Sequence, residues 1–298
     1  MIKRIIYIGS AAYVSTENEQ LFINRKEPES QEKVPIEDIG FLIFDSPQIT
    51  VTSFAMQKLL ANNTALIVCS PNHLPNGLML TMEGNFAQTE RFIAQIETKL
   101  PLKKNLWQLL VKAKIKNQYL LLKKLGFDFI SVKDKLDKVQ SGDATNQEAQ
   151  ASQHYWKNLF PGKKFKRERF GDYPNSLFNY GYAILRAVTA RSIVAAGLHP
   201  SIGLHHKSKY NAYCLADDIM EPYRPFVDEI VLNFYKENPE EKELNKDIKK
   251  ILLNAAYVDV KIEDQLHPLW NGVQFTCNSL VNCYSKESKT LLLPELCD

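Results

Sequence analysis

Long apolar runs are missing from this 298-residue sequence. A helix that crosses a membrane needs about 18 or more consecutive apolar residues, and no window approaches that length. The opening stretch, MIKRIIYIGSAAYV, has the basic and small residues of a signal peptide, but Tyr7, Ser10 and Tyr13 interrupt its apolar run. We interpret it as a strand that ends at Gly9, and we expect a protein that is neither exported nor embedded in a membrane.

Paired cysteines and a strong net charge are also lacking. The five cysteines are an odd number without CxxC spacing, which fits a reduced, cytoplasmic protein. The formal net charge is only +3, so any binding of nucleic acid must come from local patches and not from bulk charge. With 45% hydrophobic and 24% charged residues, the chain has the composition of an ordinary soluble protein, long enough for two domains.

The first part of the chain has the short β-branched and aromatic runs that are typical of strands. Strands are predicted at 2–8, 20–24, 39–44 and 65–69, with polar turns at 15–19 and 26–33, a helix at 52–61 and an exit loop at 71–77. Near residues 82–85 the pattern changes to long helices. We therefore expect an α+β protein, with a β-rich, β-sandwich-like domain at 1–84 and a larger all-α domain at 85–298.

Helical periodicity dominates the second part. Helices are predicted at 86–100, 106–125, 175–196, 225–235, 247–257 and 274–284, and another is expected to begin with Thr145 or Asn146 as its cap. Pro101 is expected to end the first of these helices, and Gly197 to end the helix at 175–196. The last residues, 291–298, are predicted to form a short mobile tail.

One predicted helix carries both an apolar stripe and a row of lysines. At 106–125 the stripe that includes Trp107 is interpreted as core. Lys112, Lys114 and Lys116 are interpreted as a solvated face, with contact to phosphate as the alternative. His267 lies beside Pro268 and is interpreted as structural.

The stretch from 197 to 225 crowds histidines and acids together. His205 and His206 precede a short helix predicted at 213–221, with Asn211 as its cap and Pro222 as its stop. Asp217 and Asp218 precede Glu221 by four and three residues, so two carboxylates share a face and repel each other unless a cation lies opposite. Oxygen ligands together with a His206 nitrogen suit Mn²⁺ or Mg²⁺ better than a structural zinc. The alternative is a set of exposed helix charges and polar loop histidines.

A second candidate acid lies upstream, beside a basic run. Glu148 falls in the first turn of its predicted helix, where a carboxylate is favourable for purely structural reasons. The run PGKKFKRER at 161–169 then places five basic residues against one acid, an arrangement that suits either a solvated loop or contacts to phosphate.

Several ordered motifs together resemble a known family. They are Glu148 within NQEAQAS, NYGYAILRA at 179–187, AGLHPSIGLHH and LADDIMEPYRP around the histidines and acids, and VPIEDIGFLIF at 34–44. In this combination the chain closely resembles the CRISPR adaptation integrase, CRISPR-associated protein one. KIKNQ at 114–118 is similar to its type II branch. The resemblance covers nearly the whole chain.

The resemblance implies a domain at 1–84 that forms a homodimer and a catalytic domain at 85–298 that holds one Mg²⁺ or Mn²⁺ ion. Its metal ligands and catalytic residues carry over to Glu148, His206 and Glu221, with Asp218 as a supporting acid. The family's Gly-x-x-His spacing, matched from Gly203, favours His206 over His205. The basic residues interpreted as contacts to the DNA backbone are Lys163, Lys164, Arg167, Lys207 and Lys209.

The activity implied is integration of short duplex DNA as new spacers at a CRISPR repeat, by attack of a 3′-hydroxyl on a phosphodiester. The implied partners are DNA, CRISPR-associated protein two in a heterohexamer and, in type II systems, the RNA-guided nuclease machinery. Two alternatives stay open. One is a metal-dependent nuclease in which water replaces the 3′-hydroxyl, and the other is a non-catalytic DNA-binding assembly subunit.

Overall fold

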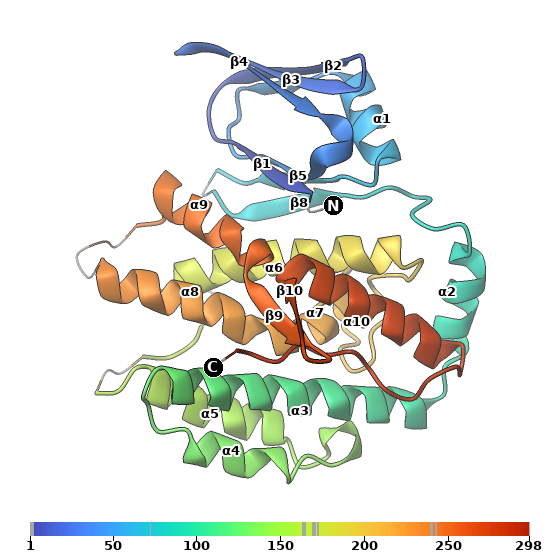
Figure 1. Cartoon of the computed structure of the whole chain (residues 1–298), viewed down its shortest axis with the longest axis vertical. Coiled ribbons are helices and arrows are strands. Elements are labelled where there is room, and N and C mark those ends of the chain that lie inside the picture. Colours follow the sequence, from blue (N-terminus) through green and yellow to red (C-terminus); the bar gives the residue numbers. More distant parts are fainter. Residues whose placement is uncertain are drawn as a thin grey trace. The chain divides into compact units, whose positions relative to one another are not determined.

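Two four-stranded sheets form the described part of the first unit, Met1–Phe86. They are seen in a computed structural model that describes residues 3–71, 73–162, 165–168, 171, 173–238, 241 and 243–297. One sheet has the order β1 (Arg4–Ile8), β5 (Ile39–Phe44), β7 (Ala65–Cys69) and β8 (Pro75–Met79). The other has the order β4 (Glu29–Pro35), β3 (Gln20–Lys26), β2 (Ala12–Glu17) and β6 (Ile49–Val51) (Figure 1). The β-rich first part predicted from the sequence is thereby confirmed.

The core of this unit depends on β5, in which all six residues are buried. β5 pairs in parallel with both β1 and β7, and strands enclosed in this way consist of continuous apolar residues. The 3₁₀ turn η1 (Ile36–Asp38) precedes β5, and α1 (Ser53–Ala61) begins at Thr52, whose hydroxyl accepts the Ala55 N–H at 3.2 Å. The turn predicted at 26–33 was wrong, because most of these residues belong to β4 and the end of β3. The first five residues of β4 are exposed and polar, so they show no apolar alternation.

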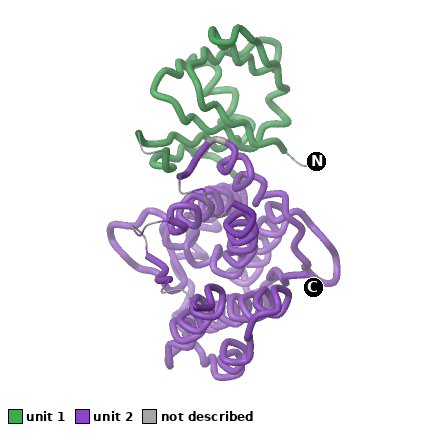
Figure 2. The backbone as a smooth tube through the Cα atoms, turned by 90° about the vertical axis from the view of Figure 1, so that its left-hand side faces the viewer, with its two compact units in different colours: residues 1–86 green, residues 87–298 purple. Residues whose placement is uncertain are grey.

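Helices make up most of the second unit, Ala87–Asp298, as predicted (Figure 2). They are α2 (Gln88–Glu97), α3 (Leu100–Lys124), α4 (Ile130–Leu136), α5 (Gln147–Leu159), α6 (Asn175–Ala195), α7 (Cys214–Met220), α8 (Arg224–Glu237), α9 (Lys246–Leu253) and α10 (Leu269–Tyr284), with the 3₁₀ turns η2 (Ser141–Asp143), η3 (Glu221–Tyr223) and η4 (Asn254–Tyr257). A hairpin of β9 (Asp259–Ile262) and β10 (Gln265–Pro268) precedes α10. Of the described helices, none is long and apolar enough to cross a membrane.

α6 is the buried centre of this unit, and it packs against α7, α8, α9 and α10. Gly181 lets α8 approach closely, because a Cβ added there would lie 2.5 Å from Cγ1 of Val227. Gly197 follows the helix with a φ of +71°, as expected for the residue that ends it. The strong apolar pattern of α6 in the sequence reflects this burial on several sides.

Two predictions about the second unit were wrong. Pro101 does not end a helix but lies in the first turn of α3, where a missing N–H costs no hydrogen bond. The tail is not mobile in the structure but docked. Its Glu295 and Lys261 of β9 exchange backbone hydrogen bonds of 2.8 and 3.0 Å.

Candidate functional site

Two of the predicted acids meet at one buried cation. Glu148 lies in the first turn of α5 and Glu221 opens η3. Between them lies Lys114 of α3, with Nζ 2.5 Å from Oε1 of Glu148 and 2.6 Å from Oε2 of Glu221. Lys114 is only 7% exposed, so its interpretation as part of a solvated face was wrong. The amphipathic pattern of α3 gave no sign that Lys114 is buried, because its two acidic partners lie outside this helix.

The start of α5 is fixed by a residue that the sequence analysis did not identify. The carboxylate of Asp143 accepts the backbone N–H groups of Gln147 at 2.8 Å and Glu148 at 3.0 Å. It therefore takes the role of helix cap that was predicted for Thr145 or Asn146. Since Asp143 is itself buried, it holds the first turn of α5, and with it Glu148, against the rest of the fold.

Glu221 follows α7 directly, and η3 continues into α8. The helix ends just before Pro222, as predicted, and Pro222 and Pro225 then fall in the first turns of η3 and α8, which need no proline N–H. The predicted cap, Asn211, lies before α7, where its Oδ1 accepts the Tyr213 N–H at 2.9 Å. The acids of α7 and η3 are thus placed by a break between two helices and not by a single helical face.

The carboxylate of Glu221 is buried between two cations. Burial alone would raise its pKa, but Arg224, with Nη2 2.9 Å from Oε1, and Lys114 hold the pKa below its ordinary value. The pKa of Lys114 is raised in turn: the two carboxylates outweigh the effect of its own burial. All three groups are therefore charged. The Lys114 ammonium is the described group that neutralises Oε2 of Glu221, at 2.6 Å.

Asp218 holds His206 in place. This fully buried carboxylate lies 2.6 Å from Nδ1 of His206 and accepts backbone N–H groups from Leu204 at 2.6 Å and His205 at 3.1 Å. A Cβ added at Gly203 would lie 2.4 Å from the His206 carbonyl oxygen and 2.8 Å from Oδ2 of Asp218, so the loop closes on the acid only with glycine there. The hydrogen bond to Asp218 raises the pKa of His206, against the opposing effect of burial. With Nδ1 engaged, Nε2 is the nitrogen that remains to bind a metal.

His205 has a different environment. Its ring stacks on Trp107 of α3, with centroids 4.4 Å apart and planes 6° from parallel. The edge of the same indole faces His206 at 5.9 Å. Trp107 is buried as the sequence predicts, and it packs against both histidine rings, whose centroids lie 5.6 Å apart.

The donors suit a hard divalent cation in their chemistry. They are two carboxylates and an imidazole, without a thiolate, and His206 lies close enough to Glu221 for each to shift the other's pKa. Among the described residues, however, no three His, Cys, Asp or Glu side chains form a group ready to hold a metal ion. The position between Glu148 and Glu221 is taken by the Lys114 ammonium, which a metal ion would displace.

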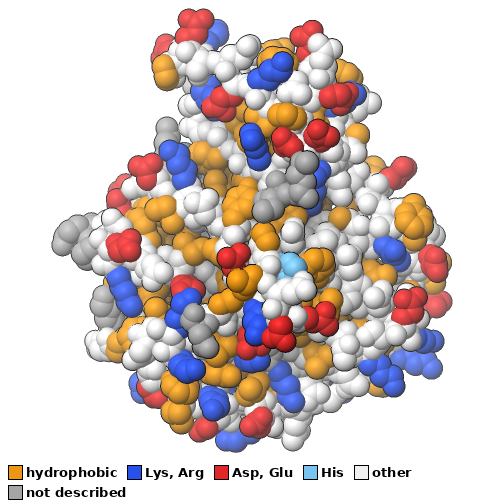
Figure 3. Space-filling model, in the orientation of Figure 1, with side chains coloured by type: hydrophobic (Ala, Val, Ile, Leu, Met, Phe, Trp, Pro, Cys, Tyr) orange, Lys and Arg blue, Asp and Glu red, His pale blue; other side chains and the backbone are white. Residues whose placement is uncertain are grey.

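A basic cavity opens beside His206. It encloses about 430 Å³ and is lined by Lys103, Lys207 and Lys209 together with polar loop residues. Burial, and then repulsion from Lys207, lower the pKa of Lys103. Figure 3 shows acidic and basic side chains interspersed on the face that it presents, which agrees with the small net charge. No ion pair joins these three lysines to an acid among the described residues, and positive charge of this kind around a hollow suits an anionic ligand.

The predicted DNA contacts fall into three groups. Lys207 and Lys209 line the basic cavity. Arg167 points into the fold, with its guanidinium 2.7 Å from Oδ1 of Asn179 and over the ring of Tyr182. The remaining two, Lys163 and Lys164, lie outside the described residues. Lys103 was missed because its helix is distant in the sequence from the loop that it faces.

Known proteins resemble this chain over most of its length. The family model described as CRISPR associated protein Cas1 matches residues 5–261. The CRISPR-associated endonuclease Cas1 of Neisseria meningitidis serogroup C is 32% identical over 99% of this chain and 97% of its own. Among solved structures, a casposase bound to integration product has a TM-score of 0.81 at 18% identity, covering 98% of this chain and 92% of its own.

A Cas6-RT-Cas1–Cas2 complex has a TM-score of 0.75 at 19% identity, over 99% of this chain and 36% of its own. At these identities the two structures show a shared fold. The family model and the Neisseria relative each match most of the chain, and three of the motifs that carry the resemblance contain Glu148, His206, Asp218 and Glu221. The chain therefore belongs to the family of CRISPR associated protein Cas1.

Proposed function

We propose that this protein is a divalent-metal-dependent DNA endonuclease and integrase of CRISPR adaptation. The observation that carries the proposal is the convergence of Glu148 and Glu221 on one buried cationic position, next to His206 on its Asp218 anchor. The 32% identical Neisseria relative, named as an endonuclease, supports the nuclease class, and the casposase neighbour supports a fold that accommodates integration products.

Glu148, His206 and Glu221 would hold the metal, which is Mg²⁺ or Mn²⁺. When bound, such an ion supplies a Lewis acid for phosphoryl oxygens. The residues of this chain position the rest. Asp218 fixes the tautomer and orientation of His206, and the basic cavity neutralises the DNA backbone without reading its sequence.

The proposed reaction is a transesterification. The 3′-hydroxyl oxygen of a short duplex loses its proton and forms a bond to phosphorus at the edge of a CRISPR repeat. The bond from that phosphorus to the 3′-oxygen of the adjoining nucleotide outside the repeat breaks, and this oxygen takes up a proton and leaves as a free 3′-hydroxyl. Positioning and charge neutralisation suffice for this step, so a covalent protein nucleophile is unnecessary. If water replaces the 3′-hydroxyl, the same residues catalyse hydrolysis, which is the second candidate function favoured by the name of the Neisseria relative.

The proposed partners are duplex DNA, a second copy of this chain that pairs through residues 1–84, and CRISPR-associated protein two in a heterohexamer. The Cas6-RT-Cas1–Cas2 neighbour supports the third of these. The last proposed partner is the type II RNA-guided nuclease machinery that selects the fragments. It is included because KIKNQ at 114–118 is similar to the type II branch of the family.

The test is strand transfer on a branched DNA substrate with Mn²⁺ or Mg²⁺. Glu148→Gln, His206→Ala and Glu221→Gln should each lower joining by more than about 100-fold, beyond the effect typical of residues that only support a ligand. Asp247→Asn, which removes an exposed acid paired with Lys250 on α9, is the matched control. Longer strands that require metal support the integrase, and shortened strands alone support the nuclease. If folded protein with its partner changes the DNA in neither way, the enzyme proposal is wrong and the chain is an assembly subunit.

A further inference from the structure

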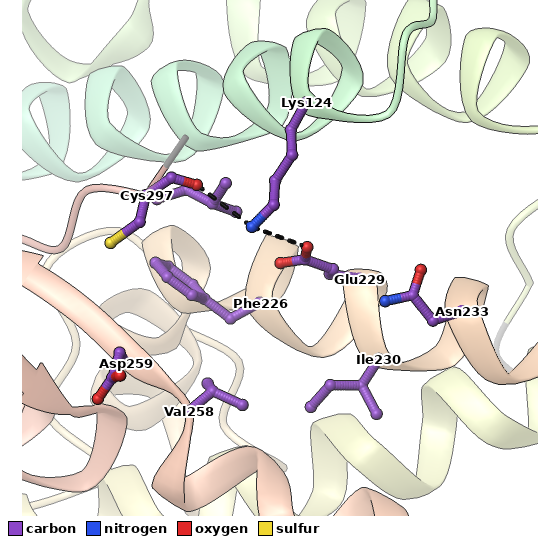
Figure 4. Close-up of a pocket in the computed structure, with 9 residues that line it drawn as sticks. Lys124, Phe226, Glu229, Ile230, Asn233, Val258, Asp259 and Cys297 are labelled. Atoms are coloured by element: carbon purple, nitrogen blue, oxygen red, sulfur yellow. Dashed lines mark hydrogen bonds and ion pairs between the residues drawn. The ribbon is translucent and has the colours of Figure 1, made fainter.

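The last described segment of the chain, residues 292–297, forms a strap across three elements. The Leu292 carbonyl accepts the Thr276 hydroxyl of α10 at 2.5 Å, and Glu295 pairs with Lys261 of β9. At the far end, Nζ of Lys124 lies 3.3 Å from the Cys297 carbonyl oxygen and also bonds to Glu229 (Figure 4). Leu296 is only 4% exposed. The strap is therefore part of the fold of the second unit.

Asn117 of α3 joins the strap to the turn that carries Glu221. Its side chain is fully buried. The amide nitrogen donates to the Pro222 carbonyl at 2.8 Å and to the Pro294 carbonyl at 3.0 Å, and the amide oxygen accepts the Leu296 N–H at 3.0 Å. Both amide N–H groups and the oxygen are thus used, one on η3 and two on the strap. When the strap leaves, two of these buried contacts lose their partners.

A second path runs through α10. The Tyr223 hydroxyl lies 2.7 Å from Oγ1 of Thr276, and Oγ1 is also bonded to the Leu292 carbonyl. Tyr223 is fully buried and is the last residue of η3. The residue after Glu221 and the one following it are therefore each tied to the strap, through different helices.

The same helix also holds the Glu221 side chain. Lys114 and Asn117 are three residues apart on α3 and share a face. One contacts the carboxylate of Glu221 and the other the carbonyl of the next residue. Glu221 is thus held by its side chain and by the backbone of the next residue. Its carboxylate therefore keeps one orientation, which is what a metal ligand needs.

We propose that residues 292–297, acting through Asn117 and Thr276, position Glu221 for metal binding. This inference rests on the proposed function in that Glu221 is taken as a ligand. Asn117 and Thr276 are positioning residues, since neither reaches the reacting atoms. The strap thereby makes the last residues of the chain part of the site scaffold, although they lie about 70 residues after Glu221.

The test uses the full-length chain. Leu296→Asp places a charge at a buried position and undocks the strap, and Asn117→Ala removes the first path while the strap stays bonded to β9. In metal-free protein, hydrogen exchange of the backbone at 219–224 should accelerate at least tenfold in both variants. Calorimetric Mn²⁺ affinity should fall about 10- to 100-fold, the effect typical of groups that orient a ligand.

Two controls isolate the role of the strap. Glu295→Gln and Lys116→Gln break an ion pair between half-exposed side chains and leave Asn117 untouched, so exchange and Mn²⁺ affinity should stay within twofold of native. Native exchange at 219–224 in both Leu296→Asp and Asn117→Ala would overturn the inference. Thr276→Val, which removes the second path, decides the matter if the other two fail to fold. If the native chain with its partner neither joins nor cuts DNA, the proposed function alone is refuted, because exchange is measured without DNA or metal.

Discussion

The two sides of the candidate site are built in opposite ways. On the helical side, Glu148 and Glu221 are compensated by Lys114 and Arg224, and Glu221 and Lys114 are buried. On the loop side, the side chain of His206 is 43% exposed, and the neighbouring lysines line an open cavity. Charges on the helical side already have partners within the fold, whereas those on the loop side are available to a ligand. Substitutions on the first side should therefore affect stability most, and those on the second should affect binding.

The largest loss of stability is expected on the helical side, when Lys114 is removed. In Lys114→Met, two carboxylates lose their shared cation while the side-chain volume is kept. We expect the free energy of unfolding of metal-free protein to fall by about 3–5 kcal/mol, the cost of breaking a buried ion pair by removal of one partner. Denaturant unfolding in the presence of EDTA measures this, and Lys112→Met on the same helix is the control.

Metal should then compensate for the missing ammonium. Added Mn²⁺ should raise the melting temperature of Lys114→Met more than that of the native chain, because the ion no longer competes with the lysine. Equal gains in the two proteins would show that the metal does not occupy the position between the carboxylates.

The stability of the helical part of the fold should also depend on pH, through Asp228 of α8. The carboxylate bonds to the hydroxyls of Tyr155 at 2.8 Å and Tyr182 at 2.5 Å, and burial raises its pKa from 3.8 to about 6. The folded chain therefore holds this proton more tightly than the unfolded chain does. Stability from this group should fall by about 3 kcal/mol as the pH rises from below 4 to above 6. Asp228→Asn should flatten that part of the stability profile, and an unchanged slope would contradict the assignment.

On the loop side, Asp218→Asn should loosen His206. We expect Mn²⁺ affinity to fall about 10- to 100-fold, because the group that orients the ligand is lost. Asp217→Asn is the matched control, since Asp217 pairs with Arg186 and not with the histidine. Calorimetry on both variants separates an anchoring role of Asp218 from a general effect of acid removal.

The same variant predicts a change with pH. The hydrogen bond to Asp218 raises the pKa of His206, so this pair stabilises the fold fully below about pH 6.5 and loses its contribution as the pH rises through the raised value. NMR titration of the imidazole should show a lower pKa in Asp218→Asn. A midpoint that does not move would mean that the hydrogen bond does not control the protonation of His206.

The smallest effect is expected at the basic cavity. Lys207→Gln and Lys103→Gln should each reduce the slope of log affinity for DNA against log salt by about 1, equally for all sequences. Lys250→Gln, at an exposed position of α9, should leave the slope unchanged. A loss of affinity that varies with DNA sequence would indicate contact with bases instead.

The fold class could be predicted from the sequence because buried helices and strands have apolar residues at regular positions. α6 and β5 are apolar on most positions, so their bounds were nearly correct, whereas exposed β4 left no pattern. His206, Asp218 and Glu221 lie close together in the chain and were visible as a cluster. Lys114 and Asn117 were not, because each acts through partners on other elements, and only the packed structure brings those together.

The position of Lys114 has a consequence for how this protein folds. A centre whose like charges are joined only by a metal cannot fold until the metal arrives. Here the chain supplies its own cation from α3, so the two acids can come together during folding without any ion from solution. Under the proposed function, folding does not wait for a metal ion, so a chelator should abolish DNA joining without unfolding the protein.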